Sequence, residues 1–172
     1  NEGYESKEHR EKRFLEGKKI LEDYYEKHSD ELGKPLFLEK KFTLKLGDTP
    51  LIGSIDRIDA FTEGSSSLVE VIDYKTGKPK DQKIVNRDEQ LTIYALAARD
   101  ALGLKPKSLA LYFVEGNEKV VTTRSDEELD KKREELKETV EEIRKSTFKP
   151  TPNFLCDWCD YRHICPVYKI GG

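Results

Sequence analysis

Residues 51–77, LIGSIDRIDAFTEGSSSLVEVIDYKTG, contain the pattern that decides the fold. Two runs rich in apolar and β-branched residues, 51–61 and 68–74, flank a polar stretch that contains Gly and Ser. Such a pattern predicts two strands joined by a turn. Each run carries an acidic residue, Asp56 in the first and Asp73 near the end of the second. The sequence therefore predicts a hairpin in which two carboxylates can stand near each other.

The spacing within each strand predicts which side chains accompany these acids. Alternate residues of a strand share a face, so Lys75 falls on the same side as Asp73. In the first run, one face is predicted to carry Ile52, Ser54, Asp56 and Ile58. A carboxylate on an apolar face needs a partner. A metal ion shared with Asp73 would provide one, and an ordinary ion pair with the nearby Arg57 is the alternative.

The remaining pattern places helices and further strands around this hairpin. The predicted elements are a helix over 5–32, a strand over 36–46, a helix over 86–102, strands over 108–115 and 119–123, and a helix over 125–145. Their order, αβββαβ(β)α, predicts an α/β (α+β) fold with a mixed sheet flanked by helices. Pro150 and Pro152 mark a boundary, so we expect a domain over 1–152 and a cysteine-bearing tail over 153–172 packed on it.

The composition limits the class of protein. The chain has 172 residues, 38% of them charged, and a formal net charge of −3, so a grip on nucleic acid must come from a local basic patch. One basic segment offers such a patch, although a solvated loop is an equal interpretation: Lys75, Lys78, Lys80, Lys83 and Arg87. The sequence has neither an apolar run of membrane-spanning length nor a secretory signal, which favours the cytoplasm. The absence of Met indicates a piece of a larger protein.

The pair of acids and the lysine suit a particular chemistry. Mg²⁺ prefers one or two carboxylates together with water and phosphate oxygens. A bound Mg²⁺ or Mn²⁺ polarises a phosphate and lowers the pKa of a bound water. An ammonium group beside the metal can orient that water or stabilise the charge of the transition state. Asp56, Asp73 and Lys75 are therefore candidate catalytic residues, although Asp-x-Lys alone occurs often by chance.

Five short motifs together resemble the RecB-like branch of the PD-(D/E)XK nuclease superfamily. They occur in the order found in that family: GSIDRID (53–59), VIDYKTG (71–77), QLTIYA (90–95), CDWC (156–159) and CP (165–166). The resemblance covers about Glu39 to Val167 and implies a restriction-endonuclease-like αβββαβ core. It also implies hydrolysis of DNA phosphodiester bonds with Mg²⁺ or Mn²⁺, by an exonuclease rather than an endonuclease.

The resemblance implies roles for individual residues. Asp56 and Asp73 would bind the metal, Lys75 would be the catalytic lysine, and the backbone carbonyl of Tyr74 would reach the metal. Gln90 and Tyr94 share one face of the following helix and would contact DNA phosphate or order the lysine. Glu39 is a second-rank candidate for the metal region. The family also carries a metal-binding histidine on an upstream helix, for which the candidates are His9, the better placed, and His28.

Three cysteines crowd the C-terminal tail, at Cys156, Cys159 and Cys165. Three thiolates within ten residues suit a metal or iron–sulfur site. In the resembling family a fourth, upstream cysteine completes a [4Fe-4S] cluster, and this chain lacks it. Either the ligand lies outside these residues in the full-length protein, or the cluster is absent. A zinc site completed by His163 and plain reduced thiols are the other interpretations.

These observations lead to three hypotheses about function. The first is a metal-dependent DNA nuclease domain of a helicase-linked repair or recombination protein, with DNA and a helicase domain or subunit as partners. The second is a non-catalytic nuclease-like module that binds DNA or serves as a scaffold in a helicase complex. The third is a small zinc-stabilised interaction module.

Overall fold

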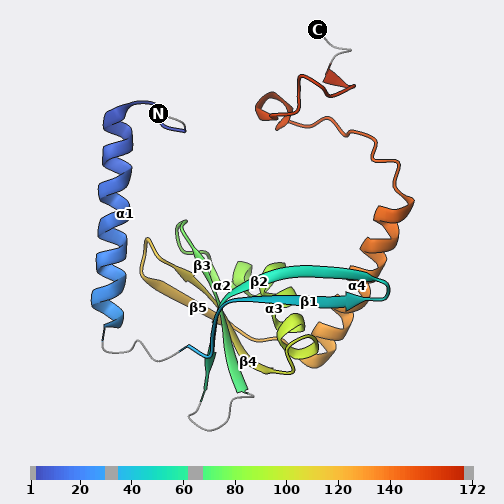
Figure 1. The fold of residues 1–172 in the computed structure, drawn as a ribbon, viewed down its shortest axis with the longest axis horizontal. Helices are drawn as coiled ribbons and strands as arrows, with labels where there is room; N and C mark the ends of the chain where they lie inside the picture. Colours follow the sequence, from blue (N-terminus) through green and yellow to red (C-terminus); the bar gives the residue numbers. More distant parts are fainter. Residues whose placement is uncertain (1–2, 30–34, 62–67, 169–172) are drawn as a thin grey trace. The chain divides into compact units, whose positions relative to one another are not determined.

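The computed structural model describes residues 3–29, 35–61 and 68–168 (Figure 1). The chain divides into two compact units, Asn1–Leu136 and Lys137–Gly172. The first unit contains the sheet and most of the helices. Its elements are α1 (Lys7–His28), β1 (Phe37–Leu46), β2 (Thr49–Ala60), β3 (Leu68–Lys75), α2 (Gln82–Val85), α3 (Glu89–Asp100), β4 (Lys105–Phe113), β5 (Glu118–Thr122) and the start of α4 (Asp126–Lys145).

Five strands form one mixed sheet in the order β1-β2-β3-β4-β5. β3 and β4 pair in parallel, and the other neighbours pair antiparallel. The parallel pair requires a crossover, which α3 provides. This arrangement confirms the predicted α/β class and the mixed sheet flanked by helices. The predicted turn over 62–67 lies outside the described residues, as do the last residues of the predicted first helix.

The helix predicted over 86–102 is wrong at its start, because the structure begins this helix, α3, only at Glu89. A separate single turn, α2, ends at Val85, and residues 86–88 separate the two helices. The Asp88 carboxylate accepts a hydrogen bond of 2.9 Å from the backbone N–H of Leu91, which caps α3. Asp81 caps α2 in the same way. Aspartate caps favour a new helix start over a continuous helix.

The core lies on the sheet face that α3 covers. Leu91, Ala95 and Ala98 of α3 are buried, while Leu102 is half-buried beyond the end of the helix. Leu109, Leu111 and Phe113 of β4 supply the opposing apolar surface. The small alanines let the helix lie close to the sheet. We call this side the front face.

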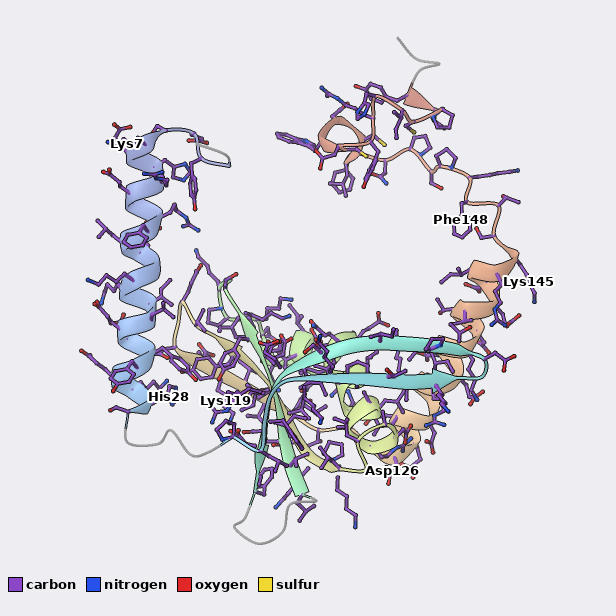
Figure 2. All side chains as sticks on the ribbon, in the orientation of Figure 1. Lys7, His28, Lys119, Asp126, Lys145 and Phe148 are labelled. Carbon is purple, nitrogen blue, oxygen red and sulfur yellow. The ribbon has the colours of Figure 1, made fainter. Side chains whose placement is uncertain are left out.

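A second, smaller cluster lies on the opposite face, which we call the back face. It is built from Ile72, Ala110 and Tyr112, and the partly buried Tyr24 and Tyr74 pack against it. Tyr24 belongs to α1, whose last turn reaches the sheet near His28 (Figure 2). α1 has no buried residue, so its position depends on a few polar and aromatic contacts at this end.

The predicted shared face of β2 is wrong. Ile52 is 71% exposed, whereas Ile55 and Ile58 are both fully buried, so the alternation breaks between them. The β1–β2 ladder pairs Leu38 with Arg57 and Lys40 with Ile55 but has no pair at the intervening position, Glu39 and Asp56. Glu39 has a φ of 47°, the left-handed region, which re-aims the strands there. Asp56 therefore leaves the face of Ile52.

The second unit contains the end of α4, a short 3₁₀ helix at Cys156–Trp158 and a series of turns. Trp158 is 86% exposed, and within this unit the described residues bury no large apolar side chain. The division into a domain over 1–152 and a tail packed on it stays a prediction. Among the described residues, no helix is both long and apolar enough to cross a membrane.

Candidate active site

The candidate residues come from β2, β3 and the first two turns of α3. The β2–β3 ladder ends with the pair Arg57 and Ile72, so Asp56 and Asp73 occupy the next position, beyond the last pair. There the backbone N–H of Tyr74 donates to Oδ2 of Asp56 at 2.9 Å, so a carboxylate takes the place of a ladder carbonyl. The structure thus brings the two acids into the neighbourhood that the hairpin predicts.

Asp73 is the most perturbed of these groups. It is only 2% exposed, and its Oδ2 lies 2.6 Å from Nζ of Lys75. The contact is an ion pair at angles unsuited to a hydrogen bond, so this buried Oδ2 has no hydrogen-bond partner among the described residues. Burial raises the pKa of Asp73 above its usual value; Lys75 opposes this, and the charges of Asp56 and Asp88 add to it. A buried carboxylate oxygen in this condition is suited to a cation.

Lys75 is held from a second side by α3. Its Nζ donates to Oε1 of Gln90 at 2.7 Å, and Nε2 of Gln90 donates to the hydroxyl of Tyr94 at 2.8 Å. The Tyr94 contact therefore fixes the Gln90 amide with its oxygen toward the lysine. Burial raises the pKa of Tyr94, which keeps its phenol protonated. The role predicted for Gln90 and Tyr94, to contact DNA phosphate or to order the lysine, stays a prediction.

Sequence reasoning missed the packing behind Tyr94. The Tyr94 ring meets the Phe42 ring edge-on, with 6.1 Å between centroids. Phe42 in turn lies against the backbone of Gly53, where a Cβ would be only 2.5 Å from the ring. A glycine inside a strand pattern signals such a close approach of another group. That signal was present in the sequence at Gly53.

The alternative considered for Asp56, an ion pair with Arg57, is not the pairing that the structure shows. Nε of Arg57 donates to Oδ1 of Asp59 at 2.7 Å, so the guanidinium pairs with the other acid of the motif. Asp56 is left with the Tyr74 N–H and with space toward Asp73. Glu39, the second-rank candidate, is exposed.

The residues fit a hard divalent cation that keeps most of its water. Within the described ranges, no three His, Cys, Asp or Glu side chains are grouped as metal ligands. The site offers two carboxylates, one of which, Asp73, has a buried oxygen whose close polar neighbour is the Lys75 ammonium. Mg²⁺ uses one or two carboxylates plus water and substrate phosphates rather than an all-protein cage. The donor set therefore suits Mg²⁺ or Mn²⁺.

The sequence profile of the PD-(D/E)XK nuclease superfamily matches residues 2–166, nearly the whole chain. The chain belongs to this superfamily. A comparison with curated proteins gives no match. Membership implies a phosphodiesterase nuclease with a nucleic-acid substrate, and nucleases of this superfamily typically use Mg²⁺.

Neither His9 nor His28, the candidates for the family's metal-binding histidine, lies beside Asp56 and Asp73. His9 is near the start of α1, where its backbone N–H donates to the Ser6 hydroxyl and its ring meets Tyr4. His28 lies at the other end of α1, and its Nε2 is within hydrogen-bond distance of the Tyr112 hydroxyl on the back face. The structure therefore places His28 against the sheet, but behind the acids rather than beside them.

The basic segment follows directly from Lys75. Lys78, Lys80, Lys83 and Arg87 are all exposed. They lie in and around α2, between the strand that carries Asp73 and the helix that carries Gln90. The exposure of these four side chains suits a phosphate-binding patch and a solvated loop equally, so both interpretations of the basic segment stand.

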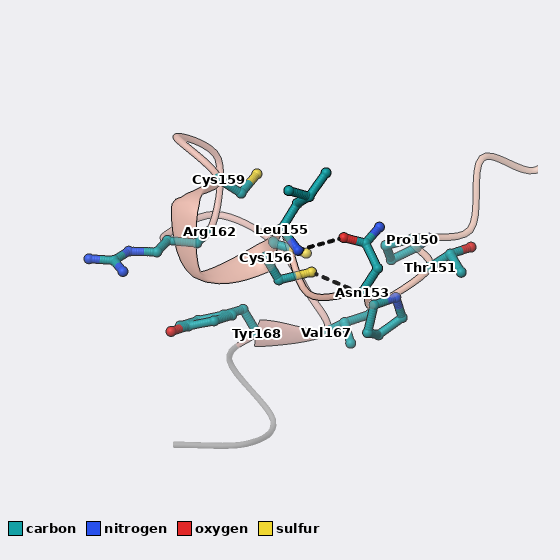
Figure 3. A pocket seen from close by; sticks show the side chains of 11 residues that line it. Pro150, Thr151, Asn153, Leu155, Cys156, Cys159, Arg162, Val167 and Tyr168 are labelled. Carbon is teal, nitrogen blue, oxygen red and sulfur yellow. Dashed lines mark hydrogen bonds between the residues drawn. The ribbon is translucent and has the colours of Figure 1, made fainter.

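The tail cysteines line one hollow of about 370 Å³ (Figure 3). Cys156 and Cys159 flank the 3₁₀ helix, and Cys165 follows in the next turns. Sγ of Cys156 accepts the backbone N–H of Asn153 at 3.3 Å. All three thiols are free, and no group of three metal-ligating side chains is assembled in the described part of the tail.

Proposed function

We propose that this superfamily member is a metal-dependent DNA nuclease of the RecB-like branch. The observation that carries the proposal is the buried Asp73 carboxylate, whose Oδ2 lies beside the Lys75 ammonium and has no hydrogen-bond partner among the described residues. A carboxylate oxygen beside a single ammonium keeps further lone pairs for a cation. The motif order of the sequence supports the branch, an exonuclease action and work alongside a helicase in DNA repair or recombination. The odd number of cysteines, which does not suit a secreted disulfide framework, supports a cytoplasmic location.

Each residue would have a distinct task in this reaction. Asp56 and Asp73 would hold Mg²⁺ or Mn²⁺, with the carbonyl of Tyr74 as a further oxygen near them. The bound metal supplies Lewis acidity toward the phosphate and a more acidic water. Lys75, oriented by Gln90, would donate to the reacting phosphate or position the attacking water. Gln90 and Tyr94 hold that ammonium in place.

Cleavage assays on single-stranded and double-stranded DNA with Mn²⁺ test this proposal. We expect Asp56→Asn, Asp73→Asn and Lys75→Ala each to abolish cleavage while circular dichroism shows an intact fold. Asp48→Asn, an exposed acid in the β1–β2 turn, is the matched control and should cleave normally. Full activity in the three site variants would overturn the assignment. Comparing linear with circular DNA separates exonuclease from endonuclease action.

The second candidate is a non-catalytic nuclease-like module that binds DNA or serves as a scaffold. The site offers only two carboxylates among the described residues, without the histidine of the resembling family. DNA binding that needs no metal, with no cleavage by the wild-type chain, would favour this candidate.

We further propose that the three tail thiolates are ligands of an iron–sulfur cluster whose fourth ligand comes from outside these 172 residues. The shared hollow of Cys156, Cys159 and Cys165 supports this proposal. Iron and sulfide analysis of anaerobically prepared protein tests it. One zinc per chain without iron would instead favour the zinc-stabilised module.

A further inference from the structure

The two proposed metal-binding acids lie just beyond the last backbone pair between β2 and β3. The last β2–β3 pair is Arg57 with Ile72, one position before Asp56 and Asp73. On the other side of β2, the β1 ladder also lacks a pair at Asp56. At this level the Tyr74 N–H donates to the Asp56 carboxylate instead of to a backbone carbonyl. Ladder hydrogen bonds therefore leave the separation of the two carboxylates weakly constrained.

The neighbours of both acids meet on the back face. Side chains alternate along a strand, so Tyr74 leaves the sheet opposite to Asp73. Nη1 of Arg57 lies 3.4 Å from the Tyr74 hydroxyl, which also contacts the Tyr24 hydroxyl at 2.9 Å. Arg57 is anchored in turn by Asp59 at 2.7 Å. We call these four residues, Tyr24, Arg57, Asp59 and Tyr74, the back-face network.

We propose that Arg57 and Tyr74 are positioning residues, which set the separation of Asp56 and Asp73 through the back-face network. This inference rests on the proposed nuclease function. Arg57 is the residue next to Asp56, and Tyr74 is the residue next to Asp73. A contact between their side chains ties β2 to β3 at the level where the ladder has stopped.

Helix α1 completes the network from outside the sheet. The Tyr24 ring meets the rings of Tyr74 and Tyr112 edge-on, at 6.0 and 5.3 Å between centroids. The Asn117 amide donates to the backbone carbonyl of Asp23, which fixes the same end of α1 beside the sheet. The last turns of α1 therefore contact Tyr74 from outside the sheet, while the tie between β2 and β3 is the Arg57–Tyr74 contact itself.

The separation of two carboxylates matters most for Mg²⁺ and Mn²⁺ binding. Mg²⁺ demands nearly ideal octahedral geometry, so a small change in ligand spacing costs affinity. Mutation of residues that hold metal ligands from behind typically lowers metal affinity or activity. Arg57 and Tyr74 point away from the reacting groups, so we expect their loss to act on metal affinity. A defect in the back-face network should therefore raise the metal concentration needed, and leave the rate at saturating metal nearly unchanged.

The test compares Tyr74→Phe with Tyr112→Phe in the whole chain. Tyr74→Phe keeps the ring but removes the hydroxyl that contacts Arg57 and Tyr24. Tyr112 is the register partner of Tyr74 on β4, and its hydroxyl contacts His28 and Asn117 instead. Both variants lose one phenol on the same face, so a merely structural effect should be similar in the two. Arg57→Lys provides a second break of the network without changing its charge.

Mn²⁺ binding without DNA is followed by the EPR signal of the free ion, and cleavage is then titrated with Mn²⁺. We expect Tyr74→Phe and Arg57→Lys to weaken Mn²⁺ binding and raise the half-saturating concentration about five-fold, the effect of losing one hydrogen bond. The rate at saturating Mn²⁺ should stay within about two-fold of wild type. Tyr112→Phe should leave both values unchanged.

Equal Mn²⁺ affinity in Tyr74→Phe, Arg57→Lys and wild type would overturn the positioning role and leave the proposed nuclease site intact. Equal weakening by Tyr74→Phe and Tyr112→Phe would also overturn it, since the effect would then be general loosening. If the wild-type chain neither binds Mn²⁺ nor cleaves DNA, the proposed function fails, and the positioning role fails with it.

Discussion

The sheet edge at Asp73 and the cysteine tail both carry specific motifs, but the fold treats them differently. Asp73 and Lys75 of β3 lie 2.6 Å apart, and Gln90 of α3 meets Lys75 at 2.7 Å. Cys156, Cys159 and Cys165 lie within ten residues and line one hollow, yet the described residues there form no assembled ligand group. The difference shows that strand register and helix packing can assemble a site in the protein alone. Under the proposed cluster, a short tail without a core would depend on its ligand for the same result.

Lys75→Ala should give the largest effect, because it removes the ammonium that lies 2.6 Å from Asp73. We expect cleavage to fall at least about 10²–10³-fold, the usual cost of losing one group that stabilises a transition state. The measurement is single-turnover cleavage at saturating Mn²⁺. The exposed Lys45 of β1 provides a matched control, and Lys45→Ala should cleave normally. A comparable loss in both variants would show a general charge effect and weaken the idea of a preassembled site.

Gly53→Ala tests whether packing behind the site holds it together. The new Cβ would lie 2.5 and 2.7 Å from Cζ and Cε1 of Phe42. The ring must then move against Tyr94, which orients Gln90 toward Lys75. We expect the free energy of unfolding to fall by about 1–3 kcal/mol, as in other overpacked cores, and cleavage to fall with it.

Urea unfolding measures the cost of Gly53→Ala. The double variant Gly53→Ala with Phe42→Leu makes room for the added methyl group and should recover part of the stability. If Gly53→Ala has the same free energy of unfolding as wild type, the β1–β2 hairpin accommodates the added methyl group without destabilisation. The packing behind the site would then not be what holds the site together, and this contrast with the tail would be lost.

Asp73→Asn separates the burial of the acid from its chemistry. Because burial raises the pKa of Asp73, the folded protein keeps this proton to a higher pH than the unfolded chain does. The free energy of unfolding therefore falls as pH rises from the unfolded pKa, about 3.9, to the raised folded value, and the loss is complete above it. The asparagine amide has no proton to lose, so the Asp73→Asn variant lacks this fall. The difference in the free energy of unfolding, variant minus wild type, should therefore increase as pH rises through that range.

Urea unfolding of both proteins from about pH 3.5 to about pH 7, without metal, checks the sign of this difference. The added Mn²⁺ should then stabilise wild type and not the variant, since the ion binds the folded state. Parallel pH curves would mean that Lys75 fully compensates the buried charge.

Local pattern was sufficient for part of the site. The alternation of β3 is regular, so the prediction that Asp73 and Lys75 share a side needed no knowledge of the rest of the molecule. The spacing of Gln90 and Tyr94 on α3 was equally local, and their mutual hydrogen bond follows from it. The capping aspartates Asp81 and Asp88 were visible too, although the predicted helix over 86–102 ignored them.

Other features depend on partners that no local pattern specifies. The shared face predicted for Ile52 and Asp56 fails because the neighbouring strand takes a left-handed conformation at Glu39. The pairing of Arg57 with Asp59, and its contact with Tyr74, depend on how β2 meets β3. The position of Tyr24 depends on α1, which precedes the sheet by sequence and meets its back face only in three dimensions.

Cys159→Ser should give the smallest effect, and it tests the other side of the comparison. The thiol is exposed, and substitutions at exposed positions usually change the free energy of unfolding by less than about 0.5 kcal/mol. We expect that result in chelator-treated, reduced protein, with cleavage unchanged. In protein loaded with iron and sulfide, the same substitution should lower the iron content and destabilise the tail, because thiolate ligation would then contribute to its folding. A large loss in the metal-free protein would mean that the tail folds without a ligand, and the contrast between the two regions would disappear.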